Sequence, residues 1–431
     1  MDTEALVYAD LDGVPHLAGR LWARLRKNRE TASFEYDPAW LRHPARFSLE
    51  PALVLGEGAF HTAADTPMFG AIGDSAPDRW GRALMRRRAR RQAEREGQAV
   101  RTLREIDYLL LVDDEVRQGA LRFAERAGGP FLREPDDAQR IPPLVELPRL
   151  LAASGRVVDE QDTDDDLRLL FAPASSLGGA RPKASVRLRD GRLAIAKFPH
   201  RDDEINTVAW EAVALALAHS AGIPVPEHIL ETASGKPILI VTRFDRQGGT
   251  RIPFLSAMSM LAARDNDTHS YLELVDALRL CGAAPQQDIE QLWRRLVFNV
   301  LISNTDDHLR NHAFLYAGQN GWGLSPAYDL NPVPVDIKPR VMTTSITEDD
   351  NTASMALAFE VAGYFELQEA RAKEIAADVL ATNVLLWPVN SAPSSSSTPM
   401  LLPAIVLRAS VRRVTRPPSP RAEIAAAPAP R

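Results

Sequence analysis

The chain has 431 residues, of which 45% are hydrophobic and 25% are charged, a balance typical of a globular protein with enough apolar residues for two or three domains. Its formal net charge of −6 gives no general attraction to nucleic acid, and its single cysteine excludes an internal disulfide. No window approaches the roughly 18 uninterrupted apolar residues of a membrane span, and the start lacks the features of a signal peptide. These features predict a cytoplasmic protein that makes no contact with a membrane.

The first predicted domain, residues 1–125, combines short strands with helices. Alternating apolar residues on both sides of Asp12-Gly13 predict a β-hairpin, because these two residue types tolerate the positive φ of a type I′ turn. "DRWGRALMRRRARRQAERE" (residues 78–96) is predicted to form a helix. Its arginine run is interpreted as a solvated face and not as a nucleic-acid site, because acidic residues follow and no aromatic residues interleave.

The rest of the chain divides by composition. The acidic tract "DEQDTDDD" (residues 159–166) is interpreted as a solvated connection. Strands then alternate with a helix up to about residue 245, after which helical patterns dominate. The end of the chain is rich in Pro, Ser and Ala without a sustained period, which predicts disorder. After the first domain we therefore expect a small lobe, a helical catalytic lobe and a tail, at residues 126–245, 246–387 and 388–431.

A glycine-bearing segment, "SSLGGARPKASVRLRDGRLAIAKF" (residues 175–198), predicts a loop followed by two strands. Gly178 and Gly179 would let backbone N–H groups approach an anion such as a phosphate. The segment fails the P-loop pattern, since neither Ser nor Thr follows Lys183. Lys197, near the end of the second strand, fits the position at which kinases grip the α- and β-phosphates. Taken alone, the segment favours an ordinary hairpin with an exposed lysine over a phosphate site.

Two further segments fit a kinase small lobe. Glu211 lies in a predicted helix that stops at Gly222, and it could orient Lys197 as the kinase Lys–Glu pair does, or simply face solvent. The buried strand in "KPILIVTRFDR" then runs into a polar segment. In a kinase this segment would be the hinge that receives adenine, with side chains near Thr242 and Phe244.

The polar stretch "NTDDHLRN" (residues 304–311) follows an apolar helical run. In the kinase catalytic loop the base aspartate is followed five positions later by an asparagine that holds Mg²⁺, and Asp306 with Asn311 has this spacing. A predicted hairpin then leads to Asp329, the candidate for the other metal ligand. Each residue by itself could be a turn or cap residue. All three in order, downstream of Lys197, favour phosphotransfer.

A rival interpretation is a metal-dependent hydrolase. The carboxylates and imidazoles of "DDHLRNH" could bind a transition metal. This interpretation leaves the glycine loop and Lys197 unexplained, and the sequence offers no second His-rich cluster. His308 is instead expected to stabilise the catalytic loop by a hydrogen bond.

Six short motifs occur in an order that resembles the HipA-type serine/threonine kinases, the toxin components of bacterial toxin–antitoxin systems. The resemblance runs from about residue 5 to about residue 385, through "SSLGGARPKA", "IAKF", "AGIPVPE", "RFDR", "NTDDHLRNHAFL" and "SPAYDLNP". It implies an α+β fold: a bilobal protein-kinase-like structure with an N-terminal β-rich subdomain and a mainly helical C-terminal lobe.

The resemblance also implies an activity and partners. The activity is ATP- and Mg²⁺-dependent phosphorylation of serine or threonine in a protein of translation. A helix-turn-helix antitoxin similar to HipB is the implied partner, and DNA would be reached only through it. By similarity, Asp306 is the catalytic base, Asn311 and Asp329 are the Mg²⁺ ligands, and Ser176 is autophosphorylated. The remaining residues assigned to the nucleotide site are Gly178, Gly179, Lys183, Lys197, Glu211, Thr242, Phe244 and His308.

Two alternative functions stay open at this point. A small-molecule kinase of the same fold would phosphorylate a metabolite, and a catalytically silent module would hold an antitoxin on DNA. The chain also departs from the family pattern in "AIGDSAPDRWGR" (residues 71–82), which suggests a different subgroup, and in its low-complexity end.

Overall fold

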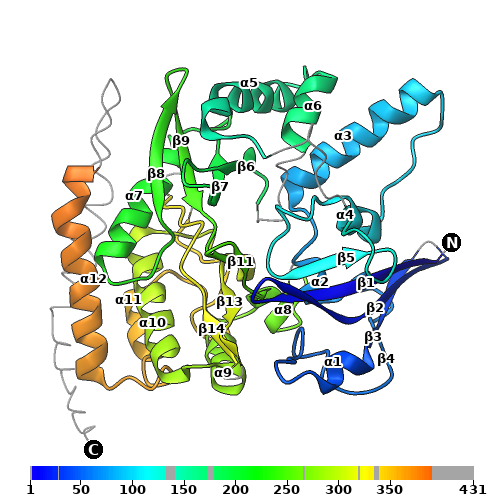
Figure 1. Cartoon of the computed structure of the whole chain (residues 1–431). Coiled ribbons are helices and arrows are strands. Elements are labelled where there is room, and N and C mark those ends of the chain that lie inside the picture. The colour runs from blue at the N-terminus through cyan, green and yellow to red at the C-terminus, as the bar shows by residue number, and fades with distance from the viewer. Residues whose placement is uncertain are drawn as a thin grey trace, which may run out of the picture.

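The computed structural model describes residues 2–27, 29–132, 141–171, 179–265, 267–318, 321–333 and 339–390. It has the predicted α+β, kinase-like fold. In Figure 1 an N-terminal β-rich domain packs beside a small sheet and a mainly helical lobe. The expected tail lies outside the described residues from residue 391 onward. Within the described part of the chain, no helix is long and apolar enough to cross a membrane.

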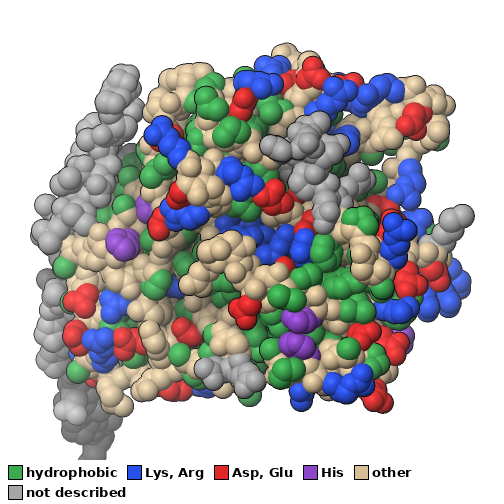
Figure 2. Space-filling view, in the orientation of Figure 1, with side chains coloured by type: hydrophobic (Ala, Val, Ile, Leu, Met, Phe, Trp, Pro, Cys, Tyr) green, Lys and Arg blue, Asp and Glu red, His purple; other side chains and the backbone are tan. Residues whose placement is uncertain are grey.

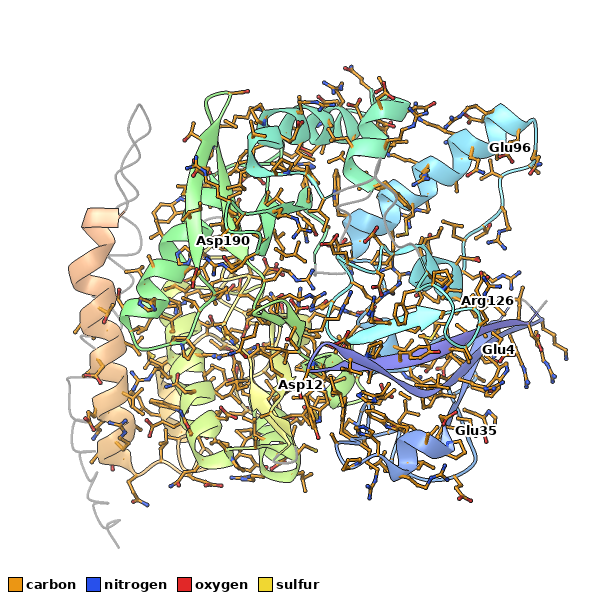
Figure 3. The ribbon with its side chains drawn as sticks, in the orientation of Figure 1. Glu4, Asp12, Glu35, Glu96, Arg126 and Asp190 are labelled. Atoms are coloured by element: carbon orange, nitrogen blue, oxygen red, sulfur yellow. The ribbon has the colours of Figure 1, made fainter. Side chains whose placement is uncertain are left out.

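The N-terminal domain is built on a five-stranded antiparallel sheet with the order β4-β3-β2-β1-β5. The predicted hairpin is present: Leu11 lies opposite Val14, and Asp12 and Gly13 have φ of +52° and +81°. Figure 3 shows Asp12 at the tip of this hairpin. The strands are β1 (Thr3–Leu11), β2 (Val14–Arg26), β3 (Arg29–Tyr36), β4 (Ala59–His61) and β5 (Leu121–Ala124), and the helices are α1 (Pro38–Arg42), α2 (Gly70–Gly73), α3 (Arg79–Glu96) and α4 (Glu105–Leu111).

Helix α3 forms as predicted, but its arginine run is not simply a solvated face. Arg87 lies 2.5 Å and Arg91 2.9 Å from the carboxylate of Asp162, whose side chain is only 2% exposed. The acidic tract that contains Asp162 is therefore not a solvated connection either. The two charged runs neutralise each other across the fold, which neither run can reveal in isolation. Figure 2 shows charges of both signs interspersed on the visible face, and Figure 3 shows Glu96 at the outer end of α3.

The small lobe is a four-stranded antiparallel sheet with the order β6-β7-β9-β8. Helix α7 contacts β8 and β9 and carries Glu211. Lys183 and Lys197 are directly opposite each other on β6 and β7. The elements are η1 (Leu144–Glu146), α5 (Leu147–Val158), α6 (Asp164–Phe171), β6 (Lys183–Arg187), β7 (Leu193–Lys197), α7 (Thr207–Ser220), β8 (His228–Ala233) and β9 (Lys236–Thr242).

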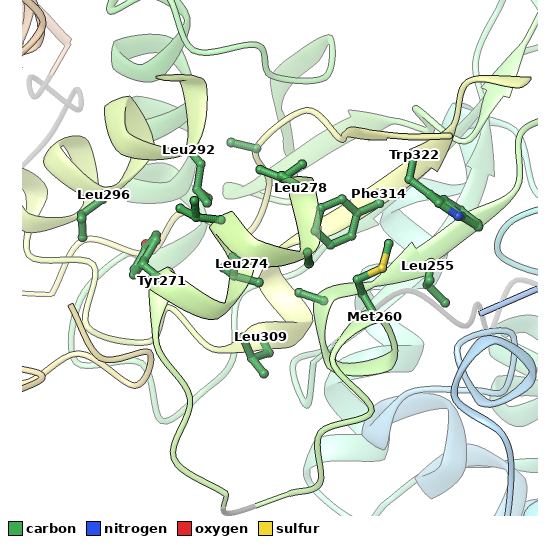
Figure 4. Packing of buried hydrophobic residues seen from close by; sticks show 14 of the residues in the cluster. Leu255, Met260, Tyr271, Leu274, Leu278, Leu292, Leu296, Leu309, Phe314 and Trp322 are labelled. Carbon is green, nitrogen blue, oxygen red and sulfur yellow. The ribbon is translucent and has the colours of Figure 1, made fainter. Parts of the chain in front are cut away.

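The catalytic lobe packs around α10, whose side chains are buried from Leu292 to its end. Figure 4 shows leucines of α9 and α10 packed with Phe314 and Trp322 of a small three-stranded sheet. Helix α12 contacts both α10 and α7. The elements are β10 (Arg246–Gln247), β11 (Thr250–Arg251), β12 (Phe254–Ser256), α8 (Ala257–Met260), α9 (Tyr271–Cys281), α10 (Pro285–Ile302), η2 (Leu309–Asn311), β13 (Ala313–Tyr316), β14 (Trp322–Leu324), α11 (Met355–Glu360) and α12 (Glu369–Asn390).

Candidate active site

The buried helix α10 delivers the polar stretch to the site. The helix ends at Ser303, which adopts a left-handed conformation with φ +58° and turns the chain out of the core. Asp306 in the following loop is exposed, whereas the adjacent Asp307 is buried. Of these two neighbouring carboxylates, only that of Asp306 is open to solvent.

The buried Asp307 anchors the loop. Tyr271 of α9 donates its hydroxyl proton to this carboxylate, and His312 Nε2 lies 2.9 Å from Asp307 Oδ1. Burial alone would raise the pKa of Asp307, but the neighbouring His312 and the bond from Tyr271 outweigh it and lower the pKa. The backbone carbonyl of Asp307 accepts bonds from both the N–H and the hydroxyl of Thr344, at 3.1 and 2.6 Å. Asp307 is therefore a structural residue.

A chain of amide side chains links this anchor to the segment after Asp329. Asn299 Nδ2 donates to the Tyr271 hydroxyl and Asn304 Nδ2 donates to Asn299 Oδ1, both at 3.1 Å. Asn304 Oδ1 then accepts from the backbone N–H of Asn331 at 3.3 Å. The loop with Asp306 and the segment with Asp329 are thus held in fixed relation.

Asn311 and Asp329 fit a magnesium ion by the chemistry of their atoms. Asn311 Nδ2 donates to the carbonyl of Asp306 at 2.9 Å, which leaves Oδ1 as the atom that could ligate. Asp329 contributes carboxylate oxygens, and Mg²⁺ prefers such hard oxygen ligands, usually one or two from the protein with the rest from phosphates and water. The described residues contain no group of three or more His, Cys, Asp or Glu side chains that could hold a metal without such help.

Lys197 joins the small lobe to the catalytic lobe. Its ammonium group lies 2.5 Å from Glu211 Oε1 and 2.6 Å from Asp329 Oδ1. Burial would lower the pKa of Lys197, but the two carboxylates outweigh it and raise the pKa. Burial would likewise raise the pKa of Asp329, but Lys197 and Lys183 bring it down to about 2. Lys197 and Asp329 therefore both carry charge at neutral pH.

Gly179 and Lys183 form the described glycine-loop end of the site. Ser176 and Gly178 lie outside the described residues, whereas Gly179 has φ +107°, a backbone conformation that favours glycine. Lys183 is buried and pairs with Asp78, the residue that caps α3. The structure thus brings a residue of the N-terminal domain to this loop, where the sequence predicted none.

The remaining predicted residues lie around this centre. Thr242 ends β9, and its backbone N–H donates to the carbonyl of Glu227 at 2.8 Å, so that group is already used within the sheet. The ring of Phe244 lies 5.3 Å from that of Tyr328, beside Asp329. His308 has a buried Nδ1 without a hydrogen-bond partner among the described residues, so the hydrogen bond expected of this side chain is not formed through Nδ1.

Sequence reasoning missed Asp78, Tyr271 and Thr344. Asp78 carries a local signal only as a helix cap, since it precedes a helical pattern. Tyr271 and Thr344 look like an ordinary aromatic core residue and an ordinary loop residue. Their bonds to Asp307 span 36 and 37 residues, so no local pattern could point to them.

The comparisons with known proteins agree with this geometry. Residues 15–106 match the HipA N-terminal domain family, and residues 175–387 match the HipA-like C-terminal domain family. Two proteins of Sinorhizobium fredii are similar in sequence. The first, named Putative kinase Y4mE, is 26% identical over 341 residues, 72% of this chain and 75% of that protein. The second, named Putative kinase Y4dM, is 31% identical over 135 residues, 28% of this chain and 32% of that protein.

A solved structure shows the same fold. The HipA chain in the Shewanella oneidensis toxin–antitoxin complex of HipA, HipB and operator DNA aligns with a TM-score of 0.63 and 16% identity. The alignment covers 94% of this chain and 96% of that one, so the likeness includes the N-terminal domain as well as both lobes. With matches to both HipA domains in the expected order, the chain belongs to the HipA family.

Proposed function

We propose that this protein is an ATP- and Mg²⁺-dependent serine/threonine protein kinase that acts as the toxin of a toxin–antitoxin pair. One observation carries the proposal: Lys197 bonds both Glu211 on α7 and Asp329, which lies 132 residues further along the chain. A lysine on the protein surface would not need two carboxylate partners from different lobes. Two such partners are expected for a lysine that must stay charged and fixed beside a phosphate and a metal ligand.

The roles of the residues follow from this arrangement. ATP with Mg²⁺ supplies the phosphoryl group and neutralises charge as that group is transferred. Lys197 would hold the phosphates, and Asn311 with Asp329 would hold the metal. Asp306, exposed at the loop, orients the acceptor hydroxyl and takes its proton. Asp307, Tyr271 and Thr344 keep the loop in place and touch no substrate.

The proposal extends to partners and targets. A HipB-like helix-turn-helix antitoxin is the proposed partner, supported by the Shewanella complex with HipB and operator DNA. The proposed substrate is a serine or threonine in a protein of translation, and Ser176 is the proposed site of autophosphorylation. We place the reaction in the cytoplasm.

Phosphate mapping tests these finer statements. Purified protein is incubated with γ-labelled ATP and Mg²⁺, alone and with a ribosome-free translation extract, and phosphorylated residues are mapped by mass spectrometry. A Ser176→Ala variant is run in parallel. We expect label on Ser176 in the parent, none at that position in the variant, and label on extract proteins with both. ATP binding without label on any protein, with or without extract, would contradict a protein kinase and favour a small-molecule kinase or a silent antitoxin-binding module.

A further inference from the structure

Two lysines lie side by side in the small lobe. Lys183 on β6 and Lys197 on β7 are directly opposite in the antiparallel register. Like charges in this position destabilise a sheet. The protein balances them with separate carboxylates: Lys197 has Glu211 and Asp329, and Lys183 has Asp78. Only Asp78 comes from outside the two kinase lobes.

The pair of Asp78 and Lys183 is well defined. Lys183 Nζ lies 2.8 Å from Asp78 Oδ2, and the two side chains are only 5% and 3% exposed. The other carboxylate oxygen accepts the backbone N–H of Gly81 at 2.7 Å, which fixes Asp78 at the start of α3. A buried ammonium group without a counter-ion tends to lose its proton. Asp78 therefore supplies the buried ammonium group of Lys183 with a counter-ion and fixes its direction.

Lys183 also lies close to the glycine loop. A Cβ atom added to Gly179 would lie only 3.0 Å from Lys183 Nζ. The indole N–H of Trp80, two residues after Asp78, donates to the Lys183 carbonyl at 2.9 Å. Lys183 also lies directly opposite Lys197 in the strand register, beside the ammonium group that contacts Glu211 and Asp329. The first turn of α3 thus holds this lysine at both its backbone and its ammonium group.

We propose that Asp78 is a positioning residue of the phosphate-binding site. By holding Lys183 as a second cation beside Lys197, it makes the N-terminal domain a part of the nucleotide site and not only a neighbour of it. The proposal rests on the proposed kinase function. It explains why the segment "SAPDRWG" brings an aspartate, a helix start and a tryptophan together.

Asp78→Asn isolates the charge, because asparagine caps a helix about as well as aspartate and can still accept from Gly81. Lys183→Met and the double variant complete a cycle. Glu105→Gln is the matched control: it breaks the pair between Arg82 of α3 and Glu105 of α4, at 2.5 Å, on the same helix but away from the two lysines. Binding of a non-hydrolysable ATP analogue with Mg²⁺ is measured by calorimetry, and KM for ATP and kcat are measured separately.

We expect Asp78→Asn to weaken analogue binding and raise KM about tenfold, the size of one charge-assisted hydrogen bond, with kcat little changed. The double variant should bind no more weakly than Lys183→Met alone, since the two residues act together. Glu105→Gln should lower the melting temperature and leave binding unchanged. The proposal fails if Asp78→Asn binds the analogue as tightly as the parent does. It also fails if the effect of Asp78→Asn adds in full to that of Lys183→Met, because Asp78 would then have only a structural role. If the parent itself does not bind the analogue, the proposed function fails first.

Discussion

Buried carboxylates in the catalytic lobe differ from those where the N-terminal domain contacts it. Asp329 contacts the ammonium group of Lys197, Asp307 contacts His312 and the hydroxyl of Tyr271, and the pKa values of both carboxyls are lowered. Glu50 and Asp74 face neutral donors: Glu50 accepts the backbone N–H of Ala71, and Asp74 accepts the N–H and hydroxyl of Ser256 at 2.7 and 2.8 Å. Burial dominates there and raises both pKa values, that of Glu50 to about 7. In these four carboxyls the partners decide whether the effect of burial on the pKa is overcome.

The sharpest test within the catalytic lobe compares two adjacent aspartates. Asp306→Asn removes the exposed carboxylate that we assign to proton transfer, so phosphotransfer should fall about a thousandfold. Because the side chain is exposed, the melting temperature should stay that of the parent. Initial rates of ADP formation and thermal unfolding measure the two effects. Full activity in this variant would remove Asp306 from the mechanism.

Asp307→Asn should do the reverse. It leaves Tyr271 and His312 without the buried carboxylate that joins them, which should lower the free energy of unfolding by about 3 kcal/mol. Urea unfolding checks this value. An unchanged midpoint would mean that Asp307 does not anchor the loop.

The raised pKa of Glu50 can be tested through the pH dependence of stability. Its pKa of about 7 in the folded protein lies above the usual 4.5, so the folded state holds this proton more tightly than the unfolded state. The contribution is complete below about pH 4.5 and is lost as the pH rises through 7. From pH 5 to 7.5 the parent should lose roughly 2 kcal/mol relative to Glu50→Gln. Parallel unfolding curves over this range would show that Glu50 titrates normally.

The smallest effect is expected from Glu211→Gln. Lys197 keeps Asp329 but loses one of its two carboxyl partners, so kcat/KM for ATP should fall about tenfold. The exposed Glu204, just before α7, gives the control Glu204→Gln, which should match the parent. Equal rates in both variants would mean that Glu211 does not hold Lys197 for catalysis.

Much of the fold could be predicted because its signals are local. The Asp12-Gly13 hairpin, the helix at residues 79–96 and the strands that carry Lys183 and Lys197 each follow from patterns within a few residues. The pairing of the arginine run with the acidic tract could not be predicted, since Arg87 and Asp162 are 75 residues apart. Composition identified both runs as charged and could not show that they neutralise each other.

The residues of the candidate site likewise divide into those that local sequence patterns predicted and those that they could not predict. The spacing from Asp306 to Asn311 and the order of Lys197, Glu211 and Asp329 predicted two groups of residues. In the structure a hydrogen bond joins Asn311 to Asp306, and Lys197 contacts both Glu211 and Asp329. Asp78 could not be predicted, because it lies 105 residues before Lys183 in another domain. A sequence motif describes one segment, whereas this contact needs the tertiary structure.

The most direct test of the central claim is phosphoryl transfer from γ-labelled ATP, measured side by side in the parent and Asp306→Asn with Mg²⁺ present. Analogue binding and melting temperature are recorded for both proteins. The account predicts transfer by the parent, about a thousandfold less by the variant, and equal binding and stability. A parent that binds ATP with Mg²⁺ yet transfers no phosphate, or a variant that transfers it as fast as the parent, would contradict a phosphotransfer site centred on Asp306.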